Sequence, residues 1–115
     1  MMTNKELIDY AKSLDCRKDY GSLFEFAKNY LMNPNIADDE KSRSLFATIK
    51  FFMDNPRSDT TAFALGKRGR YFESVIKDWC RMMLGDKDLR GLSANELHYV
   101  MGYCVRLSKI QSAGI

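Results

Sequence analysis

The residues with the clearest chemical potential are cations that cluster just after the middle of the chain. Residues 66–70 combine two glycines with three positive charges, and the helix expected after them adds two more cations. Glycine lets a backbone approach an anion closely, and lysine and arginine neutralise phosphates without reading any base. In a helix that begins at residue 67, most of these cations would lie on one side. We therefore predict that the backbone of RNA or DNA is contacted by Lys67, Arg68, Arg70, Lys77 and Arg81.

Two other interpretations of this segment remain open. Its charges can simply keep a helix junction solvated, because Glu73 and Asp78 lie near enough in sequence to form surface ion pairs with the cations. It can also be the turn of a DNA-binding helix-turn-helix, with a first helix over residues 60–65 and a recognition helix over residues 70–83. The segment is not a Walker loop, because the required G-x-x-x-x-G-K-[ST] spacing is absent.

A mixed aromatic and cationic face on the last expected helix is the second candidate site. It consists of His98, Tyr99, Tyr103 and Arg106, with Gly102 between them. Tyrosine rings and guanidinium planes stack well on unpaired bases. Aromatic side chains on a second face of a helix more often pack against another helix or subunit. We expect these four residues to form an interface with a protein partner or a second copy of the chain, or a second surface for a base.

The sequence offers little support for catalysis. It has one histidine, no serine or cysteine in a recognisable nucleophile setting, and no metal-ligand spacing. The three cysteines, Cys16, Cys80 and Cys104, are far apart and form no C-x-x-C pair. We expect a protein that is not an enzyme and that holds no metal or cofactor.

Charge and hydropathy limit the partners. The net charge is +3, divided into −1 for residues 1–56 and +4 for residues 57–115, so the basic character belongs to the second half. No apolar run approaches the roughly 20 residues that span a bilayer, and the N-terminus lacks the apolar core of a signal peptide. These features predict a cytoplasmic protein without a membrane partner.

Helical signals position the candidate residues. Capping boxes that begin at Thr3 and Ser93 predict the starts of the first and last helices, and Pro34 and Pro56 follow the ends of two others. No segment alternates with a period of two, so we predict an all-α protein: a compact bundle of five or six helices, with residues 1–115 as a single domain. We favour a helix break at residues 66–69, a charged loop over residues 86–91 and a frayed tail over residues 110–115. The expected helices cover residues 3–14, 20–32, 38–54, 60–65, 71–84 and 95–109.

The combined features predict a helical accessory protein that contacts a nucleic-acid backbone. A charge of +3 is small for strong binding by a single copy, which favours a subunit of a larger nucleoprotein assembly. In size, helical content and mild basicity the chain resembles the small subunits of CRISPR interference complexes, and this resemblance implies the same kind of setting without assigning any residue. The alternatives are an adaptor or regulator that docks another protein through the aromatic face of the last helix, and a helix-turn-helix regulator.

Overall fold

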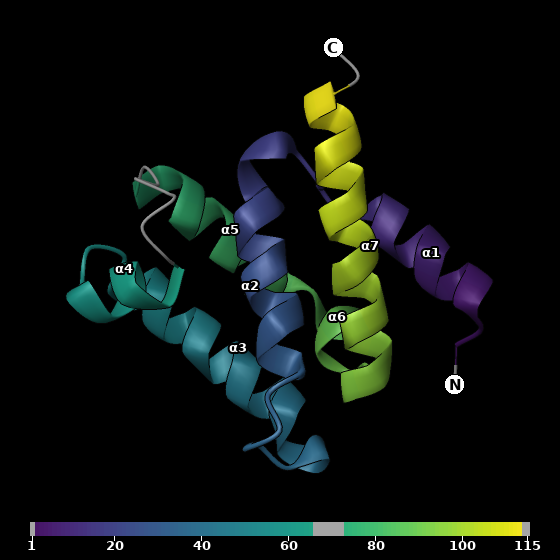
Figure 1. Cartoon of the computed structure of the whole chain (residues 1–115), viewed down its shortest axis with the longest axis horizontal. Helices are drawn as coiled ribbons and strands as arrows, with labels where there is room; N and C mark the ends of the chain where they lie inside the picture. The colour runs from purple at the N-terminus through teal and green to yellow at the C-terminus, as the bar shows by residue number, and fades with distance from the viewer. Residues whose placement is uncertain (1, 66–72, 114–115) are drawn as a thin grey trace.

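A computed structural model describes residues 2–65 and 73–113, with side chains through residue 110. Over these ranges the chain forms seven α-helices, one 3₁₀ turn and no strand, which confirms the predicted all-α class (Figure 1). The elements are α1 (Asn4–Ser13), η1 (Lys18–Tyr20), α2 (Gly21–Leu31), α3 (Asp38–Asp54), α4 (Asp59–Leu65), α5 (Glu73–Gly85), α6 (Lys87–Arg90) and α7 (Ala94–Ala113).

Helices α2 and α7 form the centre of the bundle. They pack along one another, α1 packs against α7, and α3 packs against α5 (Figure 1). Trp79 of α5 is fully buried and meets Phe24 of α2 edge to face, with ring centroids 5.9 Å apart. Ile76 and Met83, on the same face of α5, are also buried. These three residues form an apolar stripe along α5 that faces the core.

Both predicted capping boxes are present. The Thr3 hydroxyl accepts from the Glu6 backbone N–H, and the Ser93 hydroxyl accepts from that of Glu96. The Glu96 carboxylate accepts from the backbone N–H of Ser93 at 3.1 Å and also from that of Met2 at 3.0 Å. The start of the last helix is thereby tied to the start of the chain, and these two donors lower the pKa of Glu96.

Between α5 and α7 the structure differs from the prediction. Residues 86–91 were expected to form a charged loop, but they contain the single-turn helix α6. Two contacts explain the turn: the Asp86 carboxylate caps it by accepting from the Leu89 backbone N–H at 3.0 Å, and the Leu89 side chain is fully buried. The Tyr10 hydroxyl of α1 donates to the same carboxylate and so joins α1 to this corner.

At the C-terminal end, α7 continues to Ala113, four residues into the segment 110–115 that was expected to fray. The predicted break at residues 66–69 lies outside the described residues.

All three cysteines are free and buried, and burial raises the pKa of the Cys80 thiol to about 12. None of the helices in the described ranges has the length and apolar character needed to cross a membrane.

Candidate binding surfaces

The predicted basic row is only partly within the described residues. Lys67, Arg68 and Arg70 lie outside them, so the geometry concerns Lys77 and Arg81 on α5. The two cations are exposed to different degrees, with 41% of the Lys77 side chain and 69% of the Arg81 side chain accessible to solvent.

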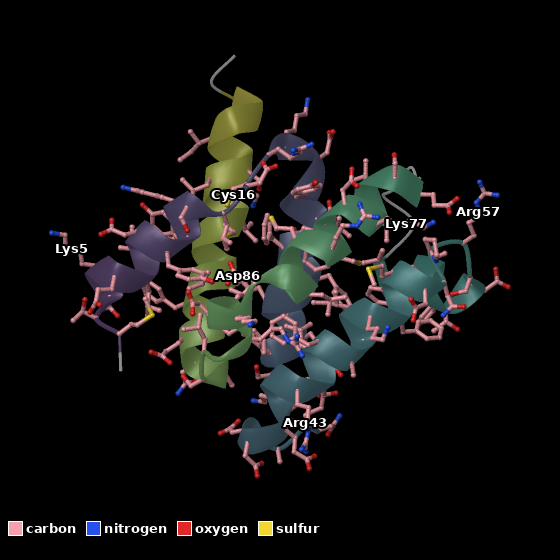
Figure 2. All side chains as sticks on the ribbon, turned by 180° about the vertical axis from the view of Figure 1, so that it is seen from behind. Lys5, Cys16, Arg43, Arg57, Lys77 and Asp86 are labelled. Atoms are coloured by element: carbon pink, nitrogen blue, oxygen red, sulfur yellow. The ribbon has the colours of Figure 1, made fainter. Side chains whose placement is uncertain are left out.

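Both cations have an acidic partner. Lys77 Nζ lies 3.0 Å from Glu73 Oε1, and Arg81 Nη1 lies 3.2 Å from Asp78 Oδ1. The other oxygen of the Glu73 carboxylate pairs with Arg57 Nε at 2.7 Å. Figure 2 shows Arg57 and Lys77 at the same end of the molecule. The hydrogen bond from Lys77, together with the charge of Arg57, lowers the pKa of Glu73. This part of the row is therefore locally neutralised by carboxylates.

The four residues predicted on the last helix lie together at one hollow in the surface. His98, Tyr99, Tyr103 and Arg106 line a pocket of about 190 Å³ with Gly102, and Lys28 of α2 completes it. We call this the α2–α7 pocket. Helical spacing explains the grouping, because residues three, four, seven and eight apart share one side of a helix. Lys28 could not be assigned from the sequence, because only the packing of α2 on α7 brings it here.

Charge in the α2–α7 pocket is positive and uncompensated. None of the described residues that line it is acidic, and neither Lys28 nor Arg106 forms an ion pair within the described part of the chain. Tyr99 keeps 37% of its surface exposed, so part of its ring is available to a partner. The pocket therefore offers two cations and two tyrosines without a competing carboxylate.

His98 is the least satisfied polar residue of this pocket. Its Nε2 is buried and has no hydrogen-bond partner among the described residues. Burial lowers the pKa of His98, and the charges of Lys28 and Lys41 lower it further. Lys41 itself bonds to Asp38 at 2.8 Å. The imidazole is accordingly neutral at pH 7, and the positive charge of the pocket comes from Lys28 and Arg106.

A second hollow was missed by the sequence reasoning. It is a groove of about 510 Å³ between α3 and the end of α5 with α6. Arg43, Phe46, Ala47 and Lys50 of α3 form one wall, and Leu84 and Arg90 contribute to the other. We call it the α3–α6 groove. The α3 residues share one stripe in the sequence, but the opposite wall depends on how α5 and α6 pack against α3.

Two further hypotheses can be placed on the structure. Helices α4 and α5 flank the turn required by the helix-turn-helix hypothesis, and that turn lies outside the described residues. As for metals, no group of three or more His, Cys, Asp or Glu residues gathers within the ranges that the structure describes.

Comparison of the chain with protein-family models, with curated proteins and with solved structures gives no match. The chemistry of the two hollows and of the α5 row is therefore the basis for assigning a function.

Proposed function

We propose that this protein is a non-enzymatic accessory protein that contacts the backbone of a single-stranded nucleic acid through the α2–α7 pocket, as a subunit of a larger nucleoprotein assembly. The observation that carries the proposal is one hollow that holds two tyrosines together with two cations, Lys28 and Arg106, that have no acidic partner among the described residues. Single-strand binders combine these two features, because cations hold the phosphates while aromatic rings stack on the bases.

The proposed contact is weak by itself. Neutralising two phosphates of a single strand gives a slope of about −1.4 in log affinity against log salt concentration. Such a site suits a subunit whose neighbours supply further cations, and avidity then raises the total affinity without any new contact on this chain. The three free cysteines are in keeping with a reducing compartment, so a cytoplasmic location is part of the proposal.

The basic row remains a second contact within this proposal. Lys77 and Arg81 would exchange their carboxylate partners for phosphates, and exposed ion pairs of this kind contribute only about 0–1 kcal/mol. Their pairing therefore reduces the advantage of phosphate binding without preventing it. Lys67, Arg68 and Arg70 would extend the row along the backbone.

The alternative is a protein-interaction module that docks a partner through His98, Tyr99, Tyr103 and Arg106. The exposed part of the Tyr99 ring favours it, because tyrosine is enriched at protein interfaces. Salt separates the two functions, since phosphate contacts weaken steeply as salt rises and an aromatic docking face does not.

The test is a titration of labelled oligouridine RNA, oligothymidine DNA and duplex DNA at low and moderate salt. The variant is Lys28→Gln/Arg106→Gln. The control is Lys5→Gln/Lys12→Gln, which removes the same charge from exposed positions on α1. A third variant, Lys77→Gln/Arg81→Gln, tests the basic row.

We expect the pocket variant to bind single strands more weakly than wild type. Its salt slope should be shallower by about 0.7 for each phosphate that is no longer neutralised. The control should bind as wild type does. The proposal fails if no nucleic acid binds even at low salt, or if the control is weakened as much as the pocket variant. The protein-interaction function would then take its place.

A further inference from the structure

The α3–α6 groove combines an apolar floor with a cationic rim. Phe46 and Ala47 of α3 lie on one side of the floor and Leu84 of α5 on the other, and Arg43, Lys50 and Arg90 stand around them. The described residues that line the groove include three basic side chains and one acidic side chain, Asp39. The groove is therefore suited to a partner that is apolar along its centre and acidic at its edges.

The spacing of the cations favours a helical partner. Arg43 and Lys50 are seven residues apart, so they project from the same side of α3 and are separated by about 10.5 Å along its axis. Phe46 and Ala47 lie between them on that side. A helix lying along α3 would present its own side chains with the same seven-residue period, with apolar residues one turn from each charge.

Both α3 cations have an acidic partner that a carboxylate of another protein could replace. Arg43 pairs with Glu40 at 3.2 Å and Lys50 with Asp54 at 3.5 Å, within one turn of the same helix. The side chains of Arg43 and Lys50 are 79% and 65% exposed, so these pairs are weak surface contacts. Arg90 has no carboxylate partner among the described residues, and its Nη1 lies 3.5 Å from the Leu84 carbonyl oxygen. Arg43 projects from the solvent-facing side of α3 (Figure 2).

The groove is less suited to nucleic acid than the α2–α7 pocket is. Its one aromatic lining residue, Phe46, is only 7% exposed, so little of the ring is free to stack on a base. Asp39 adds a negative charge that would repel a phosphate. A carboxylate-bearing partner with aliphatic side chains uses both the floor and the rim.

We infer that the α3–α6 groove docks an acidic amphipathic helix of a partner protein, with carboxylates seven residues apart on Arg43 and Lys50 and apolar side chains between them on Ala47 and Leu84. The inference does not depend on the nucleic-acid proposal, because the two hollows share no lining residue. It gives the protein a second face through which an assembly can hold it.

The test uses a labelled synthetic helix with glutamates seven residues apart and leucines between them, a scrambled peptide of the same composition, and a third peptide with lysines in place of the glutamates. The protein variants are Arg43→Glu/Lys50→Glu and, as a matched control, Lys5→Glu/Lys12→Glu, which reverses two cations seven residues apart on α1. Figure 2 shows Lys5 far from Arg43. Circular dichroism verifies that each variant is folded.

We expect the glutamate helix to bind wild type and the control alike, and to bind Arg43→Glu/Lys50→Glu at least about tenfold more weakly. The lysine helix should bind that variant better than wild type, because its charges then match. Ala47→Gln, which adds bulk to the floor without charge, should also weaken the glutamate helix.

Three results would overturn the inference. The first is equal binding of the scrambled peptide, and the second is an equal loss of affinity in the α1 control, since either indicates general charge attraction. The third is that Arg43→Glu/Lys50→Glu, which reverses both charges, loses oligouridine binding while its affinity for the peptide is unchanged. That result would assign the groove to nucleic acid instead.

Discussion

His98 has two cations nearby and a buried ring nitrogen with no hydrogen-bond partner among the described residues. Burial, followed by the charges of Lys28 and Lys41, lowers its pKa. Protonation would place a third positive charge in a region where neither Lys28 nor His98 has a carboxylate partner among the described residues. The folded protein therefore favours the neutral imidazole over the protonated one.

The pKa shift of His98 predicts a loss of stability on acidification. In the unfolded chain a histidine takes up its proton near pH 6.5, whereas folded His98 takes it up only at lower pH. The unfolded state then binds more protons, so the free energy of unfolding falls as the pH drops below about 6.5. His98→Gln should flatten this dependence between pH 7 and pH 5, as measured by urea denaturation.

His98 is the only histidine in the chain, so the window between pH 5 and pH 7 isolates it from the carboxylates, which titrate lower. The free energy of unfolding of wild type, relative to that of the variant, should fall as the pH drops through this window. An unchanged slope in His98→Gln would mean that another group is responsible.

At the scale of elements, the start of α7 is fixed by a short network of side chains. Ser93 caps the helix by accepting from the Glu96 backbone N–H at 3.2 Å, and Glu96 in turn binds the backbone N–H groups of Ser93 and Met2. Since α7 packs against α1, α2 and α3, any fraying at its first turn weakens its packing on three other helices.

Ser93→Ala should reduce the free energy of unfolding by about 1 kcal/mol, because it leaves a backbone N–H of the first turn without its acceptor. Urea denaturation at pH 7 measures the loss. Ser22→Ala is the control, since Ser22 is exposed within α2 and alanine is the better helix former. An equal loss in both variants would show that the hydroxyl of Ser93 has no capping role.

Features set by neighbours in sequence could be predicted, and features set by distant contacts could not. Thr3 and Ser93 identified two helix starts, because a capping box depends on residues within a single turn. The Asp86 cap of the single turn α6 is local, but the turn was missed because the burial of Leu89 and the contact of Asp86 with Tyr10, 76 positions away in the sequence, arise only in the folded chain.

The same distinction between local and distant contacts applies to the candidate surfaces. His98, Tyr99, Tyr103 and Arg106 could be grouped because they share one side of a single helix. Lys28 joins them only through the packing of α2 on α7, and the α3–α6 groove exists only because α5 and α6 close its second wall. Ion pairs on α5 were anticipated from Glu73 and Asp78, and the structure contains them.

At the scale of the whole molecule, the two proposed surfaces have no lining residue in common. Lys41 and Arg43 are two residues apart and therefore project about 160° from one another around the helix axis. Lys41 lies near His98 of the α2–α7 pocket, whereas Arg43 lines the α3–α6 groove. A helix with its side chains is about 10–12 Å across, which is roughly one Debye length at 0.1 M salt.

This separation predicts that a nucleic acid and an acidic helix bind the protein at the same time. At 0.1 M salt the repulsion between the two bound anions is largely screened, so peptide affinity measured with saturating oligouridine should stay within about twofold of the value without it. Combining Lys28→Gln/Arg106→Gln with Arg43→Glu/Lys50→Glu should remove both activities additively. Displacement of the peptide by oligouridine would instead mean that the two ligands compete for one surface, and the protein could not then bridge a nucleic acid and a neighbouring subunit.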